Sequence, residues 1–330
     1  MVENHREGFE ELLSGLHARI GRARRIGITG APGAGKSTLT ARLVEAYRRT
    51  GLTVGIIAVD PTSPFTGGAL LGDRIRMEAV ALDPGVYIRS LATRGSLGGV
   101  SAATRAVADV LDAFGFDRIL METVGVGQSE LEIANASDTT VVLLVPESGD
   151  SIQTLKAGLM EIADIFVVNK ADRPGADRVR NDVELMLGLR TGRTLRETPA
   201  HHGVELNVHN PGRIAREAAT REQDGVWVPP VMKSVAIHAE GIDDLVAALD
   251  RHAHYLEKSG QLAARRRRRL REQIVDVAEQ RLRRRLWGDD AVRQYIDEVL
   301  PRIEAGELSP FGIADELLAR GAPAIARTDQ

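Results

Sequence analysis

Hydrophobic positions along this chain of 330 residues change period at Arg25. From there, short apolar runs with the length of buried strands alternate with longer segments in which apolar residues recur every three or four positions. The short runs predict seven strands, at 25–29, 53–59, 86–90, 117–121, 139–145, 164–168 and 231–236.

Segments with helical spacing fill most of the gaps between these runs. They predict helices near 36–49, 72–81, 98–114, 151–161, 175–188 and 242–256. Buried strands that alternate with helices form mostly parallel sheets covered on both faces. We therefore expect an α/β fold with a mostly parallel central sheet.

The helical pattern extends beyond the expected sheet at both ends of the chain. Residues 6–24 predict an amphipathic N-terminal helix, and the last seventy residues predict helices at 261–286, 289–304 and 310–320. A polar stretch at 190–228, punctuated by glycine and proline, reads as an insertion before the last strand. The expected organisation is an N-terminal extension, an α/β domain and a C-terminal helical arm, at 1–24, 25–260 and 261–330.

The composition narrows the class of protein. Apolar residues make up 43% and charged residues 27% of the chain, as in soluble globular proteins. The absence of cysteine excludes disulfides and cysteine-ligated metal sites, and it agrees with a reducing compartment. No apolar run reaches the ~18 residues that a membrane span needs, and the charged N-terminus has no signal-peptide core. We expect a cytoplasmic protein that does not engage a membrane.

The net charge of −3 hides a basic and then an acidic segment at the C-terminal end. Residues 261–286 carry ten arginines against three acidic residues, whereas 287–330 carry four against nine. The basic segment also has an apolar stripe at helical spacing, formed by Leu270, Ile274, Val277, Ala278, Leu282 and Leu286. A helical arm that pairs with a second subunit, a solvated face and a polyanion-binding face all fit this pattern. We favour the arm, because the acidic segment offers compensating charge within the same protein, and nucleic-acid binding is not expected.

The strongest chemical motif follows the first predicted strand. It reads GAPGAGKST and comprises Gly30, Ala31, Pro32, Gly33, Ala34, Gly35, Lys36, Ser37 and Thr38. In a strand–loop–helix setting this is the phosphate loop: backbone N–H groups surround phosphate oxygens, the lysine binds the β and γ phosphates, and the serine hydroxyl binds Mg²⁺. The sequence therefore predicts a nucleoside triphosphate site.

A second motif indicates which base is bound. A late strand ends in Asn169-Lys170-Ala171-Asp172. A carboxylate at Asp172 can accept hydrogen bonds from N1–H and the 2-amino group of guanine, a pair that adenine lacks. Further along, Val235 replaces the serine that guanine-binding proteins usually carry in a Ser-Ala pair, while the N–H of Ala236 remains available for the guanine oxygen. We expect GTP and GDP as ligands.

Two acidic residues stand at strand ends near the phosphate loop. Asp60 follows IIAV and Glu122 follows ILM, so both fall at the carboxyl edge of the expected sheet. Together with Ser37 they predict a Mg²⁺ site of the kind that neutralises charge in phosphoryl transfer.

With these motifs in place, the chain resembles the MeaB/ArgK family, the methylmalonyl-CoA mutase-associated GTPases once named LAO/AO transport system kinases. The resemblance covers about 25–260 and rests on long runs such as VDPTSPFTGGALLGDRIRM, ATRGSLGGVS, METVGVGQSE and ESGDSIQTLKAG. It implies a P-loop fold of the SIMIBI type, to which signal-recognition, MinD-type and metallochaperone GTPases belong.

The resemblance also implies roles for further residues. Asp60 begins a first switch that contains Asp73, a further Mg²⁺ candidate, and Arg76, while Glu122 stands in the second switch. Gln153 and Lys156 match a third mobile segment. Lys156 and Arg76 are the candidate cations that stabilise charge on the γ-phosphate during hydrolysis.

The function that the resemblance implies is that of a homodimeric chaperone. Such GTPases serve an adenosylcobalamin-dependent methylmalonyl-CoA mutase or a related mutase, coupling GTP hydrolysis to cofactor exchange, and the cobalamin belongs to the partner. An amino-acid transport kinase is one alternative. A nickel-insertion GTPase using His201, His202 and His209 is another, although no cysteine or acid stands at ligand spacing beside them.

Overall fold

The computed structural model describes residues 8–61, 77–93, 99–123, 129–146, 157–190 and 226–326. Seven strands form one sheet in the order β3-β2-β4-β1-β5-β6-β7, and every neighbouring pair is parallel. The strands are β1 (Arg24–Gly30), β2 (Val54–Pro61), β3 (Val86–Thr93), β4 (Arg118–Thr123), β5 (Thr139–Leu144), β6 (Ile165–Asn169) and β7 (Val231–Ser234). All seven predicted strands are confirmed, and so is the parallel α/β class.

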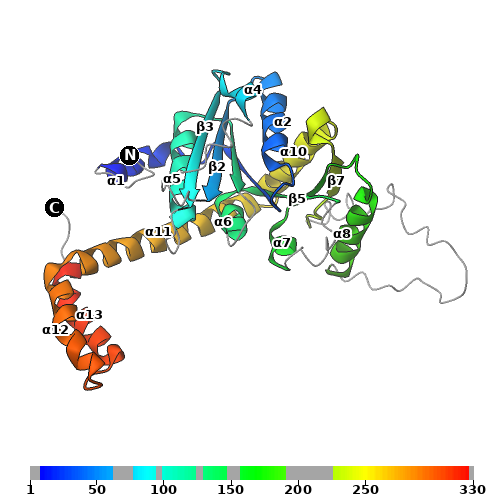
Figure 1. The fold of residues 1–330 in the computed structure, drawn as a ribbon. Helices are drawn as coiled ribbons and strands as arrows, with labels where there is room; N and C mark the ends of the chain where they lie inside the picture. The colour runs from blue at the N-terminus through cyan, green and yellow to red at the C-terminus, as the bar shows by residue number, and fades with distance from the viewer. Residues whose placement is uncertain are drawn as a thin grey trace, which may run out of the picture. The chain divides into compact units, whose positions relative to one another are not determined.

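Alternating side chains of the strands build two cores, one on each face of the sheet. Along β2, Val54 and Ile56 belong to the core beneath α2 (Lys36–Arg49) and α10 (Ile242–Lys258), whereas Ile57 and Val59 belong to the core beneath α5 (Gly99–Phe114). Figure 1 shows these helices on opposite faces of the sheet. The second face also carries α6 (Ser129–Ala136), α7 (Ala157–Ile162) and α8 (Ala176–Arg190).

One helical prediction differs from the structure in extent. The N-terminal helix α1 (Phe9–Leu16) is shorter than 6–24, because a 3-10 turn follows it and Gly21 then takes a positive φ of 98°. Helix α6 was not predicted. It has eight residues and a weak apolar stripe, and the side chain of Ile133 packs where a Cβ on Gly27 would stand, 2.6 Å away. The expected helix at 72–81 is described only as α4 (Glu78–Ala81).

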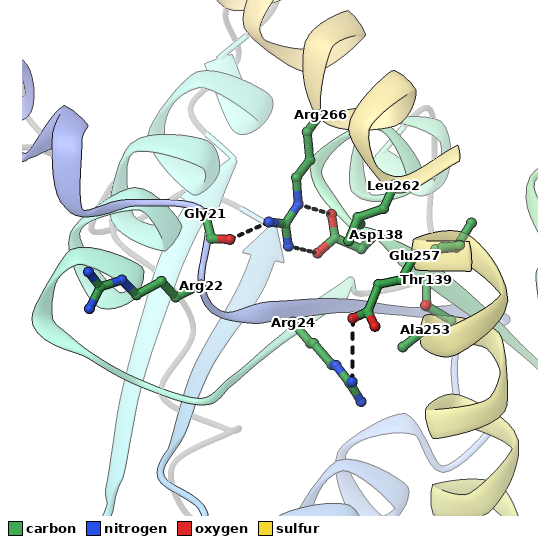
Figure 2. A pocket seen from close by; sticks show the side chains of 10 residues that line it. Gly21, Arg22, Arg24, Asp138, Thr139, Ala253, Glu257, Leu262 and Arg266 are labelled. Atoms are coloured by element: carbon green, nitrogen blue, oxygen red, sulfur yellow. Dashed lines mark hydrogen bonds and ion pairs between the residues drawn. The ribbon is translucent and has the colours of Figure 1, made fainter. Parts of the chain in front are cut away.

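The amino ends of β5 and β6 hold the start of α11 (Gln261–Gly288). Asp164 accepts two hydrogen bonds of 2.9 Å from Arg265, and the guanidinium of Arg266 pairs with Asp138 at 2.9 Å. Figure 2 shows Arg266 reaching both Asp138 and the carbonyl of Gly21 beside a small pocket. These two arginines of the basic segment are therefore tied to the sheet, and we call this set the arginine anchor.

The chain divides into two compact units, Met1–Arg266 and Arg267–Gln330. Within the second unit, α12 (Asp290–Glu304) and α13 (Pro310–Ala326) pack through Tyr295, Val299 and Ile313. Most of the predicted apolar stripe on α11 is exposed, from Val277 at 39% to Ile274 at 70%. None of the helices in the described ranges is long and apolar enough to cross a membrane.

Candidate functional site

The phosphate loop connects β1 to α2 at the carboxyl edge of the sheet. Gly30 ends the strand with φ 141°, and a Cβ there would lie 2.3 Å from the carbonyl oxygen of Leu143. Gly35 precedes the helix with φ 89°, and its Cβ would lie 2.4 Å from Asn169 Nδ2. Glycine is required at both positions because any side chain would clash with β5 or with the base motif.

Lys36 and Ser37 open α2 and are both buried. The Lys36 ammonium donates to the carbonyl oxygens of Gly30 at 2.8 Å and Ala31 at 3.0 Å, so it bends back over the loop. Thr38, the next residue of the motif, is exposed. A cation held over a glycine-rich loop at a helix N-terminus is suited to polyphosphate.

The Glu122 carboxylate joins β4 to α2 beneath this loop. Its Oε1 accepts from Ser37 Oγ at 2.6 Å and its Oε2 from Thr40 Oγ1 at 2.9 Å, and the side chain is 4% exposed. A hydroxyl and a carboxylate side by side are hard oxygen ligands, and Mg²⁺ commonly binds through one or two such groups plus phosphates and water. The residues therefore fit a magnesium ion, which Ser37 would hold directly and Glu122 directly or through water.

Asp60 reaches the same edge on the neighbouring strand. It stands in β2 opposite Ala92, one position beyond the pairing of Val59 with Thr123. The backbone thus brings Asp60 and Glu122 to adjacent strand ends, as the sequence predicted. Among the described residues, no group of three or more histidine or acidic side chains is arranged to hold a metal, and a phosphate-bound magnesium does not require one.

The base motif is connected to the phosphate loop through Asn169. Its Nδ2 donates to the carbonyl of Ala34 at 2.8 Å, while its Oδ1 accepts from Ser234 Oγ and from the N–H of Ala236, each at 3.1 Å. The side chain is 2% exposed. Asn169 therefore holds the loop and the segment after β7 in one arrangement.

The rest of the base motif lies at the surface beside Asn169. Lys170 takes a left-handed φ of 57°, and Asp172 is exposed at the start of the turn before α8. Val235 is buried, and its N–H pairs with the carbonyl of Glu240 at 3.1 Å. The backbone bonds of this turn therefore do not depend on the missing serine hydroxyl.

Several expectations fall outside the described residues. These are the switch candidates Asp73, Arg76, Gln153 and Lys156, and the histidines His201, His202 and His209 of the expected insertion. Their roles stay predictions.

The structure adds three polar residues that sequence reasoning missed. Thr40 contacts Glu122, Ser234 contacts Asn169, and Arg42 donates to the carbonyls of Ala236 and Ile237. Thr40 stands one helical turn after Lys36 and Ser37, a spacing that places it on their face of α2. That spacing was the available signal; the contacts of Ser234 and Arg42 join elements far apart in sequence.

Comparison with known proteins agrees with this geometry. Residues 1–291 match the family model described as methylmalonyl-CoA mutase-associated GTPase MeaB. A protein of Pyrococcus abyssi named as a GTPase is 43% identical over 96% of this chain and 89% of its own length. The GTPase ArgK of Escherichia coli is 33% identical over 93% of this chain and 84% of its own length.

A solved structure confirms the fold. The crystal structure of a LAO/AO transport system kinase superposes with a TM-score of 0.61 at 26% identity, covering 93% of this chain and 84% of the other. The phosphate-loop geometry, the family match along most of the chain and relatives named as GTPases lead to one assignment: this chain belongs to the MeaB family of methylmalonyl-CoA mutase-associated GTPases.

Proposed function

We propose that the chain is a Mg²⁺-dependent GTPase that acts as a chaperone of an adenosylcobalamin-dependent acyl-CoA mutase, methylmalonyl-CoA mutase or a close relative. The cobalamin is the mutase's cofactor. The nucleotide-binding part of this proposal rests on the Asn169 side chain, which is hydrogen-bonded both to Ala34 of the phosphate loop and to Ala236 after β7. The mutase part is supported by the description of the matching family.

In this proposal each part of the site has a distinct task. Backbone N–H groups of 30–38 and the Lys36 ammonium hold the phosphates, and Asn169, Lys170, Asp172 and Ala236 hold guanine. Bound magnesium would neutralise charge on the phosphate oxygens. Ser37, Glu122 and Asp60 orient it or the attacking water, and Lys156 or Arg76 approaches the γ-phosphate when the switches rearrange.

Hydrolysis by the isolated protein is expected to be slow and to accelerate when the mutase binds, because the switch cations need a partner to hold them against the γ-phosphate. The test is GTP turnover with and without an adenosylcobalamin-dependent methylmalonyl-CoA mutase from the same cell. Stimulation of at least about tenfold is expected, because a cation held against the γ-phosphate stabilises the charge of the transition state. Full-rate hydrolysis alone, with no response to the mutase, would refute the chaperone role.

We propose that the C-terminal arm mediates a homodimer. The exposed stripe on α11 supports this, because α11 presents Ile274 and Leu282 to solvent at 70% and 47% exposure in a single chain. Exposed apolar surface of this kind marks an interaction site.

A transport kinase is the second candidate, favoured by the name of the matched crystal structure. That function requires a phosphate acceptor and commonly ATP. Competition between ATP and GTP for the purified chain distinguishes the two, since Asp172 predicts a strong preference for guanine.

A further inference from the structure

The turn that follows β7 is tied to the phosphate-loop helix by one side chain that the nucleotide motifs do not include. Arg42 lies on α2, five residues after Ser37. Its Nε donates to the carbonyl of Ala236 and its Nη2 to the carbonyl of Ile237, each at 3.2 Å. One planar guanidinium therefore holds two consecutive peptide groups, a geometry that lysine cannot reproduce.

The orientation of Arg42 is itself constrained. Its remaining amino group donates to both carboxylate oxygens of Glu45, at 2.9 and 3.1 Å, one helical turn away. The Arg42 and Glu45 side chains are about one-third exposed. Arg42 and Glu45 both belong to α2, so their ion pair links no other element. It orients the Arg42 guanidinium toward the turn.

The turn is closed by hydrogen bonds within itself. Val235 and Glu240 exchange two backbone hydrogen bonds, and the N–H of Ala239 bonds back to Ala236. A Cβ on Gly241 would lie 2.4 Å from the carbonyl of Lys233, so the chain leaves the turn by a path open only to glycine. The position of the Ala236 N–H therefore depends on what holds the whole turn.

Two attachments hold it from opposite sides. Asn169 Oδ1 accepts a hydrogen bond from the Ala236 N–H, and Arg42 donates one to the Ala236 carbonyl. The backbone N–H and the backbone carbonyl of Ala236 are therefore both hydrogen-bonded. Asn169 also bonds the phosphate loop at Ala34, while Arg42 belongs to the helix that the loop begins. These hydrogen bonds connect the phosphate loop to Asn169, Asn169 to the turn, and the turn to α2, which begins at the loop.

We propose that Arg42 is a positioning residue for guanine recognition: it sets the turn at the distance from the phosphate loop at which the Ala236 N–H shares its hydrogen between Asn169 Oδ1 and the 6-oxo group of the base. The inference rests on the proposed guanine site. It adds that discrimination at the 6-position of the base depends on Arg42, a residue of α2 that does not itself contact the base.

The test compares nucleotides whose bases differ in the groups on one edge. Dissociation constants are measured for GDP, for inosine diphosphate, which lacks the 2-amino group, and for 2-aminopurine riboside diphosphate, which lacks the 6-oxo group and with it the N1–H. In Arg42→Ala, binding of GDP and of inosine diphosphate should each weaken about tenfold, the upper value for one lost neutral hydrogen bond between the Ala236 N–H and the 6-oxo group. Binding of the 2-aminopurine nucleotide should change less than about twofold. Arg42→Lys should resemble alanine, because it loses the bridge between two carbonyls.

Arg49→Ala is the matched control. Arg49 lies on the same helix and pairs with Asp243 at 2.6 Å in an exposed contact outside the turn. It should bind all three nucleotides as the unaltered chain does. Equal weakening of all three nucleotides by Arg42→Ala, or none, would overturn the inference. If the unaltered chain already bound the 2-aminopurine nucleotide as tightly as GDP, the proposed guanine contact of Ala236 itself would fail instead.

Discussion

Glu122 is a buried carboxylate whose two oxygens are each occupied by a hydroxyl of α2. This arrangement fixes the positions of Ser37 and Glu122, as the proposed magnesium site requires, because partners of this kind orient the groups that bind a metal. Thr40 has no place in the phosphate-loop motif, yet it holds one oxygen of this carboxylate at 2.9 Å.

Glu122→Gln should lower the GTPase rate about 10- to 100-fold and raise the magnesium concentration needed for half-maximal activity, the usual cost of altering a metal's supporting shell. Thr40→Val keeps the shape and removes one hydrogen bond, so its effect should be smaller and in the same direction. Magnesium titrations of the steady-state rate measure both. An unchanged magnesium dependence in Glu122→Gln would place the metal elsewhere.

Asp172 supports a second prediction at the residue scale. Replacement by asparagine turns an acceptor into a group that can also donate, which suits the 2-oxo group of xanthine and opposes the 2-amino group of guanine. Asp172→Asn should therefore weaken GDP binding about 100-fold or more and improve binding of xanthosine diphosphate. Competition binding with both nucleotides is the measurement, and unchanged preference would remove Asp172 from the base site.

At the scale of elements, the arginine anchor joins α11 to the amino ends of β5 and β6. Asp164 is deeply buried; it accepts from Arg265 and from the N–H of Thr140, and its Oδ1 lies 3.3 Å from His252 Nε2. Burial alone would raise the pKa of Asp164, but its contacts with His252 and Arg265 outweigh burial and hold the pKa below the ordinary 3.8.

A lowered native pKa has a definite consequence for stability against pH. The Asp164 carboxylate stabilises the fold fully above its ordinary pKa near 3.8, and this contribution is lost as the pH falls below that value toward the native pKa. Asp164→Asn should reduce the free energy of unfolding at pH 7 by about 3 kcal/mol, as expected when one partner of a buried pair is removed.

Urea unfolding at pH 7 and in steps down to pH 3 measures this effect. The difference between Asp164→Asn and the unaltered chain should shrink as the solution becomes acidic, because protonation removes the same charge. Asp243→Asn, at an exposed pair with Arg49, is the control and should leave stability nearly unchanged. A pH-independent difference would show that the charge of Asp164 is not what stabilises the anchor.

At the scale of the whole molecule, the proposed homodimer explains why the apolar stripe of α11 is exposed. Ile274→Asp combined with Leu282→Asp should convert a dimer into a species with the 35.7 kDa mass of one chain, since a charge in an apolar interface has no partner. Light scattering after size-exclusion chromatography measures the mass. Glu279→Ala, exposed on the same helix, should remain dimeric. A monomeric unaltered chain would contradict the arm's proposed role.

The sequence predicted most of the fold because its signals are local. A strand of consecutive apolar residues and a glycine-rich loop before a helix can each be recognised without knowing the rest of the molecule. Helix α6 escaped prediction because its short, weak stripe is specified by contact with Gly27 on a distant strand. The same limit applies to the basic segment, where Arg265 and Arg266 looked equivalent to the arginines that follow them.

By itself, then, the sequence determined the strands along the chain, most of the helices, the phosphate loop and the base motif, since each depends on residues that are neighbours along the chain. Only the tertiary structure decided which polar groups meet across the sheet. It brought Thr40 to Glu122, Arg42 to the turn at Ala236, and Arg265 to Asp164. Such pairings join residues 82 to 194 positions apart, and their partners are chosen by strand order and side-chain direction, which no local pattern encodes.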